Sequence, residues 1–377
     1  MTRRVVRLPS DGPRSFEVVS YGRAGLQMPG RFSRAQIAQI SRTVRHTPEV
    51  MVKVTGGGTS RGAVAAHFAY LSRRGSLEIE TDEGERIGRL EEQRRLIDDW
   101  HLELTAGQYR TQRDGGPARR PTKLVHNIVL SMPSPTPPDK VLAAARQFAR
   151  ENFRQHRYAM VLHTHQQHPH VHLVVKAENE LGRRLHIDKQ LLRDWREHFA
   201  QLMREQGIAA NATSRSIRGQ NTKKRREGIF KAQRYGKSTT MRARMIGIAT
   251  ELARTGTVED PARARLVETR KSLVSAWMKA AEVLDAQGEE ILAGEVRYFA
   301  KHLPPVLTDR QQLAAKFLRF KGAATRGRTA RPRASQSEGP GTDFVAQRAV
   351  SGGSAEPSRR SPSAHSACRE ISSPPCV

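Results

Sequence analysis

Cysteine is almost absent from this sequence. The chain has 377 residues and two cysteines, Cys368 and Cys376, both close to its C-terminal end. This usage excludes a framework of structural disulfides, on which many small secreted proteins depend. We therefore expect the protein to work in the cytosol.

Long apolar segments and aromatic residues are also scarce. No segment approaches the roughly 20 apolar residues that a helix needs to cross a bilayer, and no apolar run follows the basic N-terminus to make a secretory signal. Phe, Trp and Tyr together make up 5% of the chain, which argues against extensive stacking of nucleic-acid bases on aromatic side chains. We expect no membrane insertion.

Acidic residues are outnumbered by basic ones. The chain has 65 Lys and Arg residues against 37 Asp and Glu residues, and its formal net charge is +28. Such an excess predicts a polyanionic partner, for which nucleic acid is the default. An anionic membrane surface is the alternative, but no long amphipathic apolar helix supports it. Because charge alone provides non-specific and salt-sensitive binding, any chemistry has to come from local motifs.

Histidine is concentrated in one stretch. Five of the fourteen histidines lie within residues 163–172. Residues 158–163 and 170–175 have the composition of strands, and residues 166–169 are typical of a turn. The pattern predicts a β-hairpin with the histidines around its turn.

This hairpin would place three histidines on one surface. Alternate strand residues share a face, so His170 and His172 lie together and His163 can reach them from the partner strand. Three neutral imidazoles can hold a divalent ion and leave positions open for water or phosphate. A solvated His-rich turn is the alternative, but a His-x-His pair with a third histidine on a pairable strand favours metal binding. The opposite, apolar face would anchor the strand through Val171, Leu173 and Val175.

The histidine stretch resembles the third motif of the conjugative DNA relaxases, the His-hydrophobic-His nucleases, and is most similar to that of T-DNA border and broad-host-range plasmid relaxases. Residues 52–58 and 67–75 resemble the first motif, in which a tyrosine precedes Leu-Ser-Arg and a basic residue. Residues 126–133 are similar to the second motif with its serine, and residues 212–219 resemble the segment that ends the nuclease domain. The motifs occur in the family order.

The resemblance implies site-specific nicking of one DNA strand at a transfer origin, for conjugative transfer or plasmid mobilization. Tyr70 would attack a backbone phosphate by transesterification, forming a 5′-phosphotyrosine adduct and leaving a free 3′-OH. A half-buried packing role is the alternative for Tyr70, because it falls beside the apolar stripe of a predicted helix. Tyr109 and Tyr158 are next in line as nucleophiles.

Further residues receive roles from the same resemblance. Ser131, Arg73 and Arg74 are implied DNA contacts, and the implied metal ligands are His163, His170 and His172. Imidazole ligands suit Mn²⁺ or Zn²⁺ better than Mg²⁺, but phosphate and water oxygens would complete the site. The cofactor is therefore a divalent metal ion, Mg²⁺ or Mn²⁺, with Zn²⁺ as the alternative.

One position departs from the family pattern. Close relatives carry an acidic residue two positions after the first histidine, and often another two further on, where this chain has His165 and Gln167. A carboxylate there could orient a metal ligand or accept the tyrosyl proton. His165 is thus a candidate neighbour of the ligands or proton acceptor, and the general base stays unassigned.

The resemblance also implies partners and a location. The partners are single-stranded DNA at a transfer origin, accessory nicking proteins and the coupling protein of a type IV secretion system. The location is the bacterial cytoplasm, with export to the recipient cell alongside the DNA in horizontal gene transfer. A rolling-circle replication initiator or a transposase nuclease shares the plan of metal plus tyrosine. A non-catalytic DNA-binding protein with a structural metal would bind DNA without forming an adduct.

Strands and helices alternate along residues 49–222. Besides the hairpin, strands are predicted at 49–54, 77–81, 123–130 and 184–187. Helices are predicted at 59–72 and 90–104, from 137 after an N-cap at Thr136, and between Asp188 and Gly207. Because the central hairpin is antiparallel, we expect an α+β fold in which helices pack against an antiparallel sheet.

Three consecutive glycines, at 56–58, follow the first predicted strand. The backbone N–H groups of such a run can hold phosphate, but the Lys-Ser/Thr of a nucleotide P-loop is missing. A flexible strand-to-helix turn and a direct DNA contact therefore stay open as interpretations.

Composition divides the chain into four segments. A basic run begins at residue 223, after which strand signals end and helices are predicted at 237–254, 260–287, 289–302 and 308–320. The C-terminal region is rich in Arg, Ser, Pro and Gly, which is typical of disorder. We predict a basic flexible arm with one short helix near 34–43, a relaxase nuclease domain, a helical accessory domain and a disordered basic tail, at residues 1–48, 49–222, 223–322 and 323–377 respectively.

Overall fold

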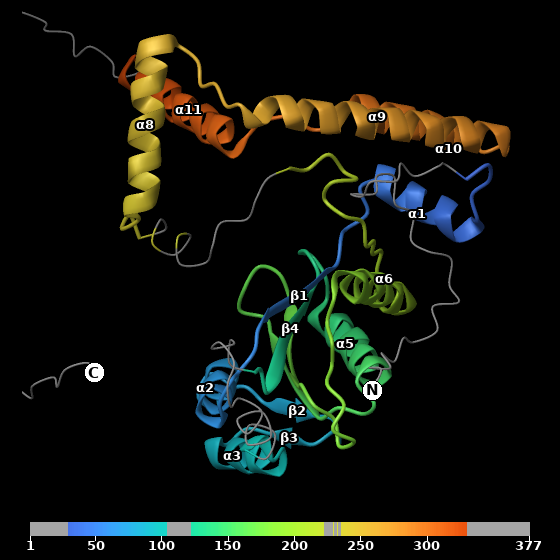
Figure 1. Ribbon diagram of the computed structural model, residues 1–377, viewed down its shortest axis with the longest axis vertical. Coiled ribbons are helices and arrows are strands. Elements are labelled where there is room, and N and C mark those ends of the chain that lie inside the picture. The colour runs from blue at the N-terminus through green and yellow to red at the C-terminus, as the bar shows by residue number, and fades with distance from the viewer. Residues whose placement is uncertain (1–28, 104–121, 222–228, 230–231, 233–234, 330–377) are drawn as a thin grey trace, which may run out of the picture. The chain divides into compact units, whose positions relative to one another are not determined.

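The computed structural model of the protein describes residues 29–103, 122–221, 229, 232 and 235–329 (Figure 1). The first 28 residues of the predicted arm, the basic run from residue 223 and most of the predicted tail lie outside these ranges. The chain divides into two compact units, Met1–Gly322 and Ala323–Val377, and all the described strands belong to the first.

One antiparallel sheet is the centre of the structure that the described residues before 222 form. Its strands run in the order β1-β4-β6-β5-β2-β3, and every neighbouring pair is antiparallel. Their bounds are Met51–Gly56 (β1), Ile79–Thr81 (β2), Arg86–Ile87 (β3), Val125–Ser131 (β4), Tyr158–His163 (β5) and His170–Lys176 (β6). The expected α+β fold with an antiparallel sheet and packed helices is confirmed.

The predicted histidine hairpin is present as β5 and β6. In its register His163 pairs with His170, and on the other side of β6 His170 pairs with Ser131 of β4. β6 therefore lies inside the sheet and is hydrogen-bonded along both edges. A strand held on two sides gives its side chains little freedom to shift, which suits a site of fixed geometry.

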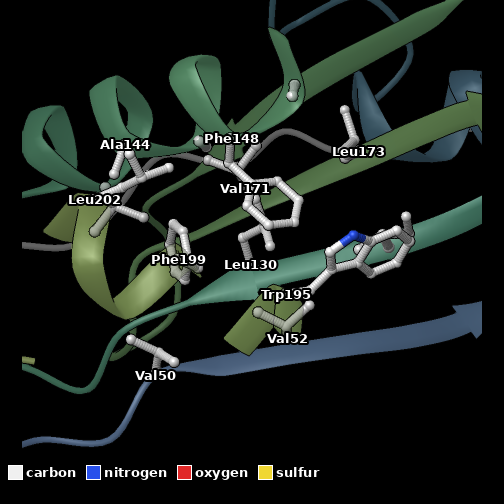
Figure 2. Packing of buried hydrophobic residues seen from close by; sticks show 14 of the residues in the cluster. Val50, Val52, Leu130, Ala144, Phe148, Val171, Leu173, Trp195, Phe199 and Leu202 are labelled. Atoms are coloured by element: carbon white, nitrogen blue, oxygen red, sulfur yellow. The ribbon is translucent and has the colours of Figure 1, made fainter. Parts of the chain in front are cut away.

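Two helices cover one face of the sheet, α5 (Pro138–Asn152) and α6 (Lys189–Glu205) (Figure 1). α6 begins where predicted, because the Asp188 side chain accepts a hydrogen bond from the Leu191 N–H at 2.7 Å. Figure 2 shows the apolar core between sheet and helices, drawn with side chains such as Val52, Leu130, Phe148, Val171, Leu173, Trp195 and Phe199. The predicted apolar face of β6 is thus the face buried against α5 and α6.

The opposite face of the sheet meets α2 (Arg61–Leu71) and α3 (Leu90–Asp99). Ser60 caps α2 by accepting a hydrogen bond from the Ala63 N–H. The core on this side takes in the predicted stripe of α2 together with residues of α3 and of the strands, namely Val64, Phe68, Leu71, Leu96, Ile97, Val161 and Val174. His163, His170 and His172 belong to the same side of the hairpin as Val161 and Val174, because strand residues alternate.

The glycine run before α2 has a packing role. A Cβ atom at Gly57 would lie 2.2 Å from the backbone oxygen of Val125, and one at Gly58 would lie 2.5 Å from the Val64 side chain. The Gly58 carbonyl also accepts a hydrogen bond from the Leu124 N–H. Glycine is therefore needed here for the close approach of two backbone segments, which favours the interpretation as a structural turn.

Helices make up the described chain after residue 235. The predicted helices are present as α8 (Thr239–Thr255), α9 (Ala262–Ala286), α10 (Glu290–Lys301) and α11 (Asp309–Thr329). Trp277 is the largest buried side chain of the core between α9 and α10, and its indole donates a hydrogen bond to the Ile217 carbonyl at 3.0 Å. None of the described helices is both long and apolar enough to cross a membrane.

The short helix expected near 34–43 is α1 (Arg34–Val44), capped by Ser33 in a capping box with Gln36. Its buried residues Ile40 and Val44 join the core of α9 and α10. The basic composition and the Gly and Pro breaks of residues 1–48 predict a flexible arm around this helix. The described part of that segment instead contributes apolar side chains to a core.

Two sequence predictions are corrected by the structure. Residues 184–187 form an isolated bridge, Glu178 with Arg184, and no strand, because the side-chain oxygen of Asn179 accepts two backbone N–H groups and turns the chain there. The N-cap position of helix α5 is Pro137, without a side-chain cap, and not Thr136, whose hydroxyl donates to the Pro133 carbonyl instead.

Candidate functional site

Three histidines of the hairpin meet at one point. The nitrogen atoms that His163, His170 and His172 can offer to a metal all lie within 4.8 Å of one another. The ring centroids are 4.6 Å apart for His163 and His172, 5.1 Å for His170 and His172 and 5.2 Å for His163 and His170. This is the set that the spacing predicts, and it is compatible with a divalent metal site.

Two of the three histidines, His163 and His172, favour the neutral form that binds metals. Burial lowers the pKa of His172 to about 3, with further lowering by the nearby His163 and His170. Burial also lowers the pKa of His163. Because a metal competes with protons for imidazole nitrogen, a cluster that resists protonation has its lone pairs available near neutral pH.

Backbone carbonyls orient two of the three rings. The Nε2 atom of His163 lies 2.8 Å from the Leu71 carbonyl oxygen, and the Nδ1 atom of His170 lies 2.9 Å from the His168 carbonyl oxygen. A carbonyl can only accept, so each of these nitrogens carries the proton of its ring. Nδ1 of His163 and Nε2 of His170 are left as the metal-binding atoms.

Tyr70 is connected to this cluster through its neighbour in the sequence, Leu71. It is the last residue but one of α2 and precedes Leu71, whose carbonyl holds His163. Its side chain is 68% exposed, so the half-buried packing role is wrong. Tyr158 is buried, which raises its pKa and makes it a poor nucleophile. Tyr109 lies outside the described residues.

A tight turn after α2 carries the two arginines. Arg73 and Arg74 have φ angles of +51° and +58°, a conformation that costs free energy in residues other than glycine. The turn is held by the Arg74 N–H, which donates to the Ala69 carbonyl at 2.7 Å. The positive charge of Arg73 contributes to lowering the pKa of His163 and His165, which places it within electrostatic reach of the cluster.

Ser131 has an internal partner. Its side chain is buried at the end of β4, and its hydroxyl donates to the Pro169 carbonyl at 3.1 Å. Pro169 immediately precedes His170, the residue that pairs with Ser131 in the sheet. Ser131 therefore holds the turn from which the second histidine of the cluster starts.

His165 lies where the hairpin predicts it, close to the ligands but outside the group of three. Its ring centroid is 5.1 Å from that of His163 and 6.1 Å from that of His170. Its side chain is exposed, and its pKa is lowered by slight desolvation and by the charge of Arg73.

His67 is a neighbour of the site that sequence reasoning missed. Its ring stacks on that of Tyr70, with centroids 6.4 Å apart and planes 20° apart. Burial lowers its pKa, and its charge is among the causes that lower the pKa of His172. The three-residue spacing from Tyr70 on a helix was the signal that could have found it.

A protein-family model matches the part of the chain that contains the histidine cluster. Residues 88–208 match the family described as "Relaxase: MobA/VirD2-like, nuclease domain". The matched interval contains β4, β5, β6, α5 and α6 with the three clustered histidines, and it begins after Tyr70.

Individual relatives give the same picture. The T-DNA border endonuclease VirD2 of Rhizobium radiobacter is 29% identical over 187 residues, which cover 45% of this chain and 43% of that protein. The VirD2 of Rhizobium rhizogenes is 29% identical over 186 residues, covering 45% of this chain and 42% of that protein. The chain thus spans less than half the length of these curated relatives.

A solved structure described as "Molecular Basis of Vancomycin Resistance Transfer in Staphylococcus aureus" was also matched. The match covers 45% of this chain and 99% of the chain in that structure, at 12% sequence identity. Its TM-score of 0.29 is too low to support an argument.

Proposed function

We propose that this chain, whose nuclease region is relaxase-like, nicks one strand of DNA at a transfer origin and remains attached to the cut end. The observation that carries the proposal is the link between two groups of different chemistry. The candidate ligand atoms of three histidines lie within 4.8 Å of one another, and one of these histidines is hydrogen-bonded to the residue that follows the exposed Tyr70. Such a nuclease requires a nucleophile that attacks the phosphate and a nearby metal site that stabilises the charge of the phosphate.

Tyr70 is the proposed nucleophile. Its hydroxyl oxygen attacks a backbone phosphorus atom and loses its proton, while the bond from phosphorus to the 3′ oxygen breaks. The products are a 5′-phosphotyrosine linkage and a free 3′-OH. One phosphodiester is exchanged for another, so the reverse reaction can reseal the strand without ATP.

The histidine cluster is the proposed metal site. His163, His170 and His172 would hold the ion, and the lowered pKa values of His163 and His172 fit a ligand role. When bound, a divalent ion would stabilise negative charge on the non-bridging phosphate oxygens. We propose Mg²⁺ or Mn²⁺, with Zn²⁺ as the alternative that an all-imidazole set also suits.

Arginine and serine have supporting roles in the proposal. Arg73 and Arg74 contact the phosphates that flank the cleavage point, and the turn conformation presents both side chains just beyond Tyr70. Ser131 acts through the hairpin turn, since its hydroxyl is bonded to the Pro169 carbonyl.

The proposed setting is the transfer of DNA between bacterial cells. The net charge of +28 supports a nucleic-acid partner, and the matched relatives are named as T-DNA border endonucleases. We propose single-stranded DNA, accessory nicking proteins and a type IV secretion coupling protein as partners. The chemistry belongs to residues 49–222, and residues 223–322 form an accessory helical domain.

The test uses the purified full chain with Mn²⁺ or Mg²⁺ and labelled single-stranded oligonucleotides that tile both strands of the DNA flanking its own gene. We expect one oligonucleotide to be cut and its 5′-phosphate end to migrate with the protein on a denaturing gel. Tyr70→Phe should give no such product and should bind the DNA as before. DNA binding by the unchanged protein without any adduct on any oligonucleotide would contradict the proposal and favour a non-catalytic DNA-binding protein.

A further inference from the structure

The proton of the Tyr70 hydroxyl needs an acceptor. A phenol has a pKa of about 10, so near neutral pH almost all of it is protonated and poorly nucleophilic. The described group that could hold a metal consists of three histidines and no carboxylate. A base for Tyr70 has to be sought among the other residues around it.

His67 and Tyr70 lie on the same side of α2. They are three residues apart, which brings side chains of a helix together. Their rings are near parallel at 20°, with centroids 6.4 Å apart. Tyr70 is 68% exposed, so packing does not fix its side chain, and for proton transfer its hydroxyl has to reach the imidazole by a change of side-chain torsions or through one bridging water.

The imidazole of His67 is available as an acceptor. Its Nε2 atom is buried and has no hydrogen-bond partner among the described residues. Burial holds the ring in its neutral form, in which one nitrogen keeps a lone pair. A buried polar atom without a partner costs free energy unless it is used, and this atom stands one helical turn from the proposed nucleophile.

The surroundings of His67 contain few other groups that titrate. On its own helix the neighbour is Tyr70, and from the sheet the charge of His172 is within reach. α3 packs on α2 and buries Gln93, Leu96 and Ile97, none of which titrates. Carboxylates of Asp98 and Glu103 also meet α2, but they pair with Arg61, six residues before His67. His67 therefore lies near both the nucleophile and the cluster, and among the described residues no charge contributes to its lowered pKa, which burial causes.

We infer that His67 is the proton acceptor for Tyr70, an inference that rests on the proposed nicking reaction. In the forward step the phenolic proton moves to a ring nitrogen of His67 as the tyrosyl oxygen bonds to phosphorus. The 3′ oxygen leaves with the electron pair of the broken bond and takes a proton from water. The imidazolium then returns its proton to solvent, so the step consumes no other reactant.

His165 is the competing candidate, because it stands where relatives carry a carboxylate. Its ring lies beside His163 and near Arg73, on the exposed side of the hairpin. An imidazolium formed there would be repelled by the guanidinium of Arg73, whereas His67 shows no such contribution among the causes of its lowered pKa. Within the described part of the chain, the ring contact of Tyr70 with a histidine is made by His67 and not by His165.

The experiment compares the full chain with His67→Gln, His67→Ala and the matched control His165→Gln. Two probes are used: the oligonucleotide that forms the adduct, and an aryl sulfonyl fluoride, which labels activated tyrosines without DNA or metal. We expect His67→Gln to slow adduct formation about 100- to 10,000-fold near neutral pH, the usual contribution of a general base. The deficit should shrink as the pH approaches that of phenol ionisation, and added imidazole should partly restore His67→Ala. Sulfonyl fluoride labelling of Tyr70, located by mass spectrometry, should fall in both His67 variants and not in His165→Gln.

The outcomes distinguish a failure of the proposed role of His67 from a failure of the proposed nicking function. A Tyr70 adduct that forms at an unchanged rate in folded His67→Gln overturns the inference and leaves the proposed function standing. The same holds if His165→Gln shows the larger loss and the altered pH profile. Absence of any Tyr70 adduct in the unchanged protein overturns the proposed function, and the inference with it.

Discussion

The two faces of strand β6 differ in what they do, although their residues alternate along the same seven positions. Val171, Leu173 and Val175 are buried in the core formed with α5 and α6. His170 and His172 point the other way, towards His163 and the side covered by α2. One strand thus provides both an apolar anchor and two of the proposed metal ligands, and the rigidity of the anchor keeps these histidines in place. Substitutions on the histidine face should therefore impair metal binding, and substitutions on the apolar face should impair folding stability.

The largest effect is expected on the histidine face. His172→Ala should lower the affinity for Mn²⁺ by at least about 100-fold, because it removes one of three ligands, and should abolish nicking. Stability without metal should hardly change, since the cost of burying a neutral imidazole is also removed. Calorimetric titration measures the affinity for Mn²⁺, and thermal unfolding of the metal-free protein measures its stability. Unchanged Mn²⁺ affinity in His172→Ala would separate this histidine from the metal site.

The adjacent residue should behave in the opposite way. Leu173 is almost fully buried, so Leu173→Ala should lower the free energy of unfolding by about 2–5 kcal/mol through lost contacts and a cavity. The fraction that remains folded should bind Mn²⁺ as the unchanged protein does. Urea unfolding measures the loss. A Leu173→Ala protein with normal stability but weak Mn²⁺ binding would break the division between the two faces.

A lone histidine on the apolar side gives a pH-dependent test. His126 pairs with Val175, and burial, with lesser contributions from Lys123 and Arg184, lowers its pKa from 6.5 to about 4. Between these two values the unfolded chain binds more protons, so this group's stabilising contribution is complete above pH 6.5 and is lost as pH falls through 4. The loss should be at most about 3 kcal/mol.

The control for this prediction is His126→Gln, which has no titrating ring at that position. Urea unfolding near neutral pH and near pH 4 should show a smaller acid-induced loss of stability for the variant than for the unchanged protein. Equal losses in the two proteins would mean that His126 does not contribute to the acid sensitivity of the fold.

The smallest effect is expected at His165. An Asp at this position would place a negative charge near a bound cation and beside Arg73, so His165→Asp should tighten Mn²⁺ binding by about 10-fold. His165→Asn, which has the same size as Asp without its charge, is the control. Loss of nicking in a folded His165→Asp protein would show instead that the imidazole takes part in the reaction.

Much of this arrangement could be predicted from the sequence, because it depends on local patterns. The hairpin and its two faces follow from the alternation of apolar residues and histidines around Pro169. The helices after residue 235 follow from their periodicity and start signals. The nucleophile candidate Tyr70 came from a motif, and its exposure agrees with that role.

Other features depend on contacts that the sequence does not encode locally. The position of His67 near the site follows from the packing of α2 beside the histidine hairpin, which the sequence does not show locally. The motif predicts Ser131 as a DNA contact, and the hydrogen bond from its hydroxyl to the Pro169 carbonyl joins residues 38 positions apart, which no local pattern indicates. The burial of Ile40 and Val44 depends on helices more than 200 residues away, whereas the basic composition and the Gly and Pro breaks of residues 1–48 predict a flexible arm. Residues 184–187 have strand composition, but the turn at Asn179 allows only a single bridge.

The central claim is that Tyr70 and the three histidines act as one site on DNA. The most direct measurement is tandem mass spectrometry of the protein–DNA product after nuclease digestion, made with the full chain in Mn²⁺. The account predicts a nucleotide remnant joined through its 5′-phosphate to Tyr70, absent from both His172→Ala and metal-free samples. A remnant on any other residue, or an equal yield of the Tyr70 product in His172→Ala, would contradict it.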